Sequence, residues 1–182
     1  MDIKIIIGAG DQRYDGWIAT QGEVLNLLNE DHWSKFFGNK RADALLCEHV
    51  WEHLTLEEGK NAAKICFKYL KPGAKLRCAV PDGNFSNLEY QNTIKIGGPG
   101  PVDHPASGHK VVYNYKSFGN IFKEVGFLVD LLEYCDESHR FHYNQWNIEE
   151  GFIYRSLLND PRNSNGDIKF VSLILDAVKP LN

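Results

Sequence analysis

The sequence predicts an α/β fold with a mostly parallel sheet, formed by one domain that spans residues 1–182. Two observations support this prediction. Short apolar, β-branched runs alternate along the chain with stretches of helical period. Apolar residues also make up 43% of the 182 residues and aromatic residues 12%, which is enough to fill a core.

Strands are predicted where a short apolar or alternating run is bounded by glycine, proline or polar residues. The first run, "IKIII", is closed by Gly8 and reads as a buried strand. The predicted strands, of which the second and third have the weaker patterns, are 3–7, 16–21, 23–28, 42–50, 74–80, 127–134 and 168–179.

The best-marked helix follows Thr55. This residue is a good N-cap, and Glu58 three positions later completes a capping box. The residues "KPG" at 71–73 end the helix. Apolar residues recur between these points at Leu56, Ala63, Cys66, Phe67 and Leu70.

Two further helices are predicted. The stretch 30–38 is short and ends at Gly38. The stretch 117–127 has Ser117 as its cap and Gly126 as its end. Segments 82–114 and 137–166 fit no regular element, and long irregular segments in a compact domain are usually functional or mobile.

Charge and hydropathy limit the possible partners. A net charge of −4 and a pI of about 6.0 argue against a general nucleic-acid binder. No apolar run approaches the roughly 18–20 residues of a membrane span, so no membrane partner is expected. The start "MDIKIIIGAG" lacks the pattern of a signal peptide, and we expect a cytoplasmic protein. Its four scattered cysteines are then expected to be reduced and buried.

The strand "IIIGAG", followed later by "LLCEHVWEHLT" and "YLKPGAKLRCAVPDG", resembles the class I S-adenosylmethionine-dependent methyltransferases. The resemblance covers residues 3–82 well and implies a Rossmann-like three-layer fold with an antiparallel last strand. It also implies S-adenosylmethionine as the cofactor. The compact "GAG…GWI" start is similar to a little-characterised subgroup of these enzymes.

The glycine loop after the first strand is the predicted cofactor site, because ligands of parallel sheets bind beyond the carboxyl ends of the strands. Gly8 and Gly10 allow the backbone to approach a ligand closely, with Ala9 between them. A dinucleotide fingerprint G-x-G-x-x-G would need a glycine at Arg13, so a nicotinamide or flavin site is disfavoured.

The chain departs from the family pattern in two places. About nine residues join the first two strands, so the first helix is expected to be reduced or absent. The resemblance implies an acid at the end of the second strand for the ribose, and Gln21 stands there. Asn26 and its neighbour Leu27 are implied near the adenine, where the family often has an acid.

His49, Glu52 and His53 spell H-x-x-E-H, a signature of one class of zinc peptidases. That reading needs the two histidines on one helix. Thr55 instead caps a helix that begins after both, while a strand leads into His49. We therefore expect no metal at this motif, and zinc peptidase remains a less favoured alternative. Four of the seven histidines fall in segments 82–114 and 137–166, so a metal in those segments is left open.

On the methyltransferase reading, Glu48 and His49 end a central strand beside the cofactor. His49 is a candidate general base, with simple packing as the alternative. Asp82 ends the next strand and is a second catalytic candidate, with turn capping as its alternative role. Methyl transfer depends mainly on in-line positioning, so a base matters only where the acceptor must lose a proton.

The two irregular segments are expected to overhang this site. Their aromatic and basic residues suit an amphipathic pocket for a small-molecule acceptor. The predicted substrate-binding residues are His109, Tyr113, Tyr115, Trp146 and Arg155. The sequence leaves a homodimer open. A domain of another class, which binds a partner and catalyses nothing, also remains open because of Gln21 and the short first connection.

Overall fold

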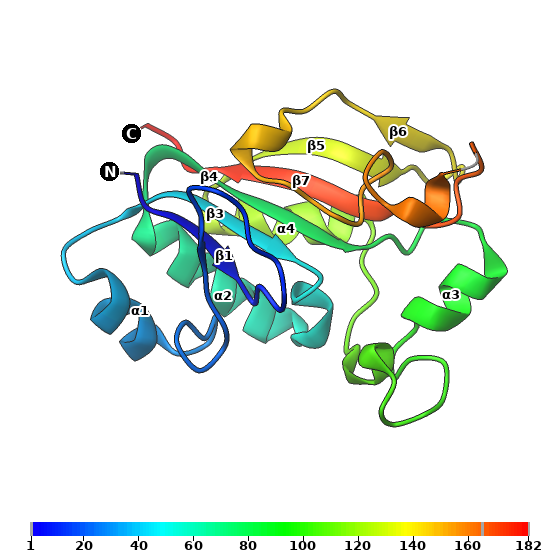
Figure 1. Cartoon of the computed structure of the whole chain (residues 1–182), viewed down its shortest axis with the longest axis horizontal. Coiled ribbons are helices and arrows are strands. Elements are labelled where there is room, and N and C mark those ends of the chain that lie inside the picture. The colour runs from blue at the N-terminus through cyan, green and yellow to red at the C-terminus, as the bar shows by residue number, and fades with distance from the viewer. Residues whose placement is uncertain (1, 165, 182) are drawn as a thin grey trace.

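A computed structural model describes residues 2–164 and 166–181. Its centre is a seven-stranded sheet with the order β2-β1-β3-β4-β7-β5-β6 (Figure 1). The four strands β1 to β4 are parallel, and β7 lies antiparallel between β4 and β5. The strands are β1 Lys4–Ile7, β2 Ile18–Ala19, β3 Ala42–Glu48, β4 Leu70–Pro81, β5 Leu128–Cys135, β6 Phe141–Tyr143 and β7 Ser172–Val178. The predicted α/β fold with its antiparallel last strand is confirmed.

Three helices cover one face of the sheet (Figure 1): α1 Glu30–Phe37, α2 Leu56–Tyr69 and α4 Tyr115–Val125. Their apolar sides join the inner face of the sheet in the larger core, which includes Trp33, Cys66 and Phe122. The remaining helix, α3 Leu88–Ile94, lies beyond the carboxyl end of β4. Four short 3₁₀ turns complete the regular structure described, at Trp51–His53, Pro105–Gly108, Ile148–Glu150 and Pro161–Asn163.

The opposite face carries no helix in the described chain and is covered by residues 144–157, which we call the covering segment. A smaller core lies beneath it and contains Ile6, Leu46, Ile174 and, from the segment itself, Ile153. The third layer of the fold is therefore irregular chain.

Buried charges hold the covering segment on the sheet. Arg77 is 1% exposed and forms two hydrogen bonds to the carboxylate of Asp176. Its remaining nitrogen donates to the carbonyl oxygens of Asn147 and Gly151, both at 2.8 Å. The carboxylate of Glu133 similarly accepts from Trp146 Nε1 and the backbone N–H of Leu157.

The first helix is absent, as expected: residues 8–17 between β1 and β2 form only turns. The predicted strand 23–28 is wrong. Backbone N–H groups of Val24 and Leu25 donate to the carbonyl of Gln21, and Asn26 Oδ1 accepts from the N–H of Leu28. These local turns hold the peptide groups that a strand would present to a neighbour.

Other predicted boundaries need smaller corrections. The capping box of Thr55 and Glu58 is confirmed at the start of α2. The cap of α4 is Asn114, because its side chain accepts two backbone hydrogen bonds, and Ser117 is the third residue of that capping box. Strand β7 begins four residues later than predicted, at Ser172. The two segments predicted to be irregular contain α3 and β6.

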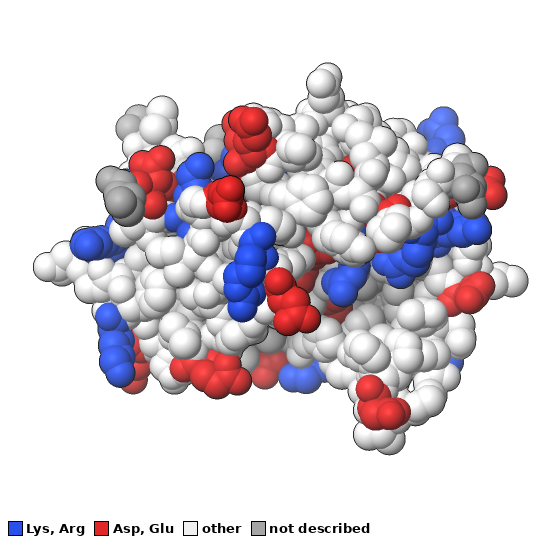
Figure 2. Space-filling view, in the orientation of Figure 1, with Lys and Arg blue, Asp and Glu red and all other residues white. Residues whose placement is uncertain are grey.

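All four cysteines are free and buried, as predicted. Among the described residues, no helix combines the length and the apolar character that crossing a bilayer requires. Basic and acidic side chains are interspersed on the face shown in Figure 2.

Candidate functional site

The site begins at the glycine loop after β1. Gly8 and Gly10 both have positive φ, at +61° and +52°. A Cβ on Gly8 would lie 2.8 Å from Val50 Cγ2, so only glycine fits against the residues that follow β3. A Cβ on Gly10 would meet nothing within 4 Å and would point into open space.

Two cavities meet at Gly8. The larger, of about 730 Å³, includes four charged residues, Asp11, Arg13, Glu48 and Arg155. Its lining is Gly8, Ala9, Gly10, Asp11, Gln12, Arg13, Tyr14, Glu48, His49, Phe152, Tyr154 and Arg155. The smaller, of about 180 Å³, is mostly apolar and is lined by Ile7, Gly8, Gly22, Leu25, Asn26, Leu27, Leu28, Val50 and Leu54. Both open at the carboxyl ends of β1 and β3, the edge expected for a ligand.

Gln21 contacts the loop. Its Nε2 donates to the carbonyl oxygen of Gly10 at 2.8 Å, and its Oε1 accepts from the Gly10 N–H at 3.3 Å. The amide thus both donates to and accepts from the backbone of the loop.

Glu48 is buried, and its carboxylate is engaged by the protein. It accepts hydrogen bonds from Gln12 Nε2 at 2.6 Å and from the backbone N–H groups of Tyr154 and Arg155 at 3.0 and 2.9 Å. Its charge joins the glycine loop to the covering segment and closes one wall of the larger cavity. The same charge, after burial, raises the pKa of Tyr14 to about 12.

His49 has a positive φ of 54°, which is uncommon for a residue other than glycine and is enriched at functional sites. Its Nε2 lies 2.8 Å from Ser172 Oγ, and its Nδ1 lies 3.3 Å from Glu52 Oε1. His49 borders the larger cavity, but both ring nitrogens already face protein groups. The H-x-x-E-H stretch spans a strand end and a 3₁₀ turn, so it lacks the single helix of the peptidase signature.

Asp82 lines neither of these cavities. Its carboxylate accepts from the backbone N–H groups of Asn84 at 2.8 Å and Cys135 at 2.6 Å, which ties the ends of β4 and β5 together. Burial raises its pKa to about 6. This placement fits the capping role rather than contact with substrate.

Of the predicted substrate-binding residues, Arg155 lines the larger cavity. Tyr113 packs in the helix-side core, and Trp146, in the covering segment, stacks on Arg77 of β4. Tyr115 hydrogen-bonds to Glu137 beside α4, and His109 lies against His53. These four side chains are therefore not brought together.

Sequence reasoning assigned no site role to six residues that line the larger cavity: Asp11, Gln12, Arg13, Tyr14, Phe152 and Tyr154. Their only signal was membership in the short first connection and in the second irregular segment.

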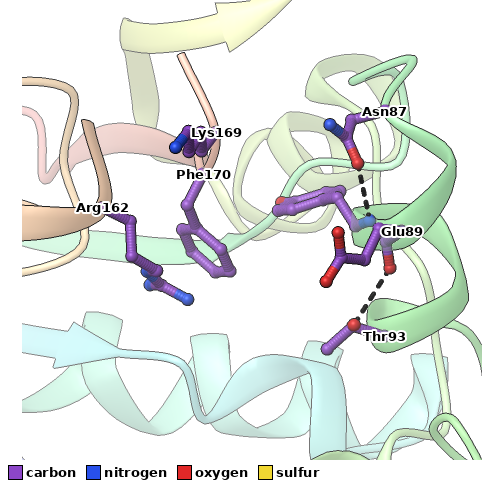
Figure 3. A pocket seen from close by; sticks show the side chains of 7 residues that line it. Asn87, Glu89, Thr93, Arg162, Lys169 and Phe170 are labelled. Atoms are coloured by element: carbon purple, nitrogen blue, oxygen red, sulfur yellow. Dashed lines mark hydrogen bonds between the residues drawn. The ribbon is translucent and has the colours of Figure 1, made fainter. Parts of the chain in front are cut away.

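It also missed a cavity of about 410 Å³ between α3 and the segment that precedes β7 (Figure 3). Phe170 stands in its wall with the Arg162 guanidinium over the ring, and the Phe170 and His49 ring centroids are 6.0 Å apart. The residues lining it are Asn87, Glu89, Tyr90, Thr93, Arg162, Lys169 and Phe170.

No family model and no curated protein matches the chain. Solved structures do. A SAM-dependent methyltransferase from Archaeoglobus fulgidus is 16% identical, with a TM-score of 0.52 over 98% of this chain and 86% of its own. A chain from the complex between the Haloferax volcanii Trm112 methyltransferase activator and a methyltransferase is 13% identical, with a TM-score of 0.55 over 98% of this chain and 82% of its own.

An O-methyltransferase family protein from Burkholderia thailandensis is 10% identical, with a TM-score of 0.50 over 90% of this chain. This chain spans only 36% of that protein's length. At such identities the likeness concerns the fold alone. The chain has the fold of the class I S-adenosylmethionine-dependent methyltransferases.

Proposed function

We propose that the protein binds S-adenosylmethionine and transfers its methyl group to a small-molecule acceptor. The observation that carries the proposal is the pair of cavities that share Gly8, one apolar and one charged, at the carboxyl ends of β1 and β3. S-adenosylmethionine likewise joins an adenine ring to a zwitterionic methionine tail. Gly8 lines both cavities and has no side chain, so a ligand that spans them can approach its backbone closely.

In this proposal the adenine occupies the smaller cavity between Leu27 and Val50, with Asn26 at its edge. The methionine portion lies along Ala9 and Gly10 in the larger cavity, where Arg155 offers a positive charge to its carboxylate and Asp11 a negative charge to its amino group. The cofactor supplies an activated methyl group on a sulfonium.

We further propose the cavity of Figure 3 as the acceptor site. It adjoins the wall formed by His49 and Phe170. Its lining is amphipathic: Lys169 and Glu89 carry opposite charges, and the guanidinium of Arg162 is paired with Asp160. Alignment of acceptor and methyl group supplies most of the rate. Ser172 and Glu52 face the two ring nitrogens of His49. We therefore propose that His49 forms part of the cavity wall, and we favour this role over removal of a proton from the acceptor.

Calorimetric titration of the purified protein with S-adenosylmethionine and S-adenosylhomocysteine tests the cofactor. Gly22→Leu adds bulk to the smaller cavity at a position where a Cβ meets nothing within 4 Å, so we expect it to weaken binding at least about tenfold. Leu88→Phe, at a side chain that is 87% exposed on α3, is the control and should bind normally.

If the folded wild type binds neither compound, the proposed cofactor and the proposed methyl transfer are both wrong. That result would favour the alternative of a non-catalytic binding domain. Normal binding by Gly22→Leu would reject only the assignment of the adenine to the smaller cavity.

A further inference from the structure

Next to His49 and outside the lining of the larger cavity lies a cluster that the proposed function does not use. It consists of Glu52 and His53, on the 3₁₀ turn between β3 and α2, and His109, which follows the turn Pro105–Gly108. A carboxylate oxygen and one ring nitrogen from each histidine lie within 4.8 Å of one another. We call these three residues the Glu-His-His cluster.

The carboxylate of Glu52 is buried without a hydrogen-bond partner. The residue is 1% exposed, and neither Oε1 nor Oε2 accepts a hydrogen bond from any described residue. His49 Nδ1 lies 3.3 Å from Oε1, without the geometry of a hydrogen bond. Burying a carboxylate in this way is strongly unfavourable unless a cation or a metal compensates the charge.

His109 is oriented as a ligand. Its Nδ1 lies 2.9 Å from the carbonyl oxygen of Ile94, which can only accept, so Nδ1 carries the proton. The lone pair is then on Nε2. Metal-binding histidines characteristically donate their second nitrogen to a carbonyl or carboxylate in this manner, which fixes the tautomer and the ring.

The backbone holds the three side chains in place. The N–H groups of Lys110 and Val111 donate to the carbonyl oxygen of Glu52 at 2.8 and 3.2 Å, which fastens the loop of His109 to the turn of Glu52. The ring of His53 packs on Gly108, where a Cβ would lie 2.8 Å from its Nδ1. The ring centroids of His53 and His109 are 5.0 Å apart.

We propose that the Glu-His-His cluster binds one Zn²⁺ through Glu52, His53 and His109. Two imidazoles and one carboxylate suit zinc better than magnesium or calcium, which prefer oxygen ligands. Three protein ligands leave the fourth tetrahedral position of the zinc to a water molecule. The metal would clamp the loop before α4 to the turn between β3 and α2. This set differs from the peptidase set, because Glu52 is a ligand and His49 is not.

Chelator-treated protein, titrated with zinc chloride by calorimetry, tests this inference without any reference to methyl transfer. We expect one Zn²⁺ per chain and a higher melting temperature with zinc. Glu52→Gln and His109→Gln should each lower zinc affinity by more than the roughly 10–100-fold that loss of an outer hydrogen-bond partner causes. His142→Gln, which removes a histidine paired with Asp136, and His104→Gln, in the same loop, should retain wild-type affinity.

Cobalt substitution of the wild type checks the ligands even if a variant fails to fold. Co²⁺ in the cluster should give the visible bands of a four- or five-coordinate site and no thiolate charge-transfer band. The proposal is overturned if folded wild type binds zinc no more tightly than His109→Gln, or if a thiolate band shows that cysteines hold the metal.

Discussion

The side-chain amide of Gln21 holds the backbone of Gly10 through both of its polar atoms. Nε2 donates to the Gly10 carbonyl, and Oε1 accepts from the Gly10 N–H. The class resemblance places a ribose-binding acid at this position, and this chain uses the position to fix its glycine loop in a left-handed conformation. Gln21, eleven residues after Gly10, therefore orders the loop that the proposed cofactor would contact.

Gln21→Ala should weaken binding of S-adenosylmethionine by about fivefold, because a loop without this support is less ordered and one hydrogen bond contributes about 1 kcal/mol. Calorimetry measures the change, with Gln145→Ala, at an exposed position in the covering segment, as the control. Unchanged or tighter binding in Gln21→Ala would show that the amide does not support the loop.

Arg77→Met should lower the free energy of unfolding by up to about 3–5 kcal/mol. It removes two hydrogen bonds to the buried carboxylate of Asp176 and leaves that carboxylate only the partly exposed Lys75, at 3.0 Å. It also removes the donors to Asn147 and Gly151, so the covering segment should become sensitive to protease. Urea denaturation and limited proteolysis measure both effects.

Combining Arg77→Met with Asp176→Leu should recover much of the stability but not the protease resistance. Arg140→Met, at an exposed pair with Asp136, should change both readouts much less. Equal effects of Arg77→Met and Arg140→Met would contradict the role given to the buried pair.

Asp82 should make stability fall as pH rises between about 4 and 6. Its pKa is raised from 3.8 to about 6 by burial, so the unfolded chain releases this proton at a lower pH than the folded chain does. In that window the unfolded state binds fewer protons, and the stability that this group contributes decreases with pH by up to about 3 kcal/mol.

Urea denaturation at several pH values from 4 to 7 measures this slope. Asp82→Asn, which keeps one acceptor oxygen for the backbone N–H groups, should lack the component that belongs to Asp82. An identical slope in wild type and Asp82→Asn would show that other groups cause the pH dependence.

His49→Gly should be more stable than His49→Ala by about 1 kcal/mol. Both substitutions remove the contacts to Ser172 and Glu52, but only glycine relieves the positive φ of 54°. Chemical denaturation of the two variants measures the difference. A more stable alanine variant would mean that the backbone here relaxes when the ring is lost.

Much of the architecture could be predicted because it depends on local patterns. The capping box at Thr55, the buried run before Gly8 and the apolar strand before Glu48 each predict their element from a few neighbouring residues. The failed strand 23–28 shows the limit. Leu25 and Leu27 are buried, but Val24 and Leu28 are exposed. Turns at Gln21 and Asn26 use the backbone groups that strand pairing requires.

The sequence by itself determined the strand-and-helix alternation, the missing first helix and the position of the glycine loop, since spacing and turn residues act over short distances. Tertiary structure decided which side chains meet. The carboxylate of Glu48 accepts hydrogen bonds from the backbone N–H groups of Tyr154 and Arg155, more than a hundred residues later. Glu52 lies beside His109. These pairings depend on how distant segments pack on the sheet, and no local pattern encodes them.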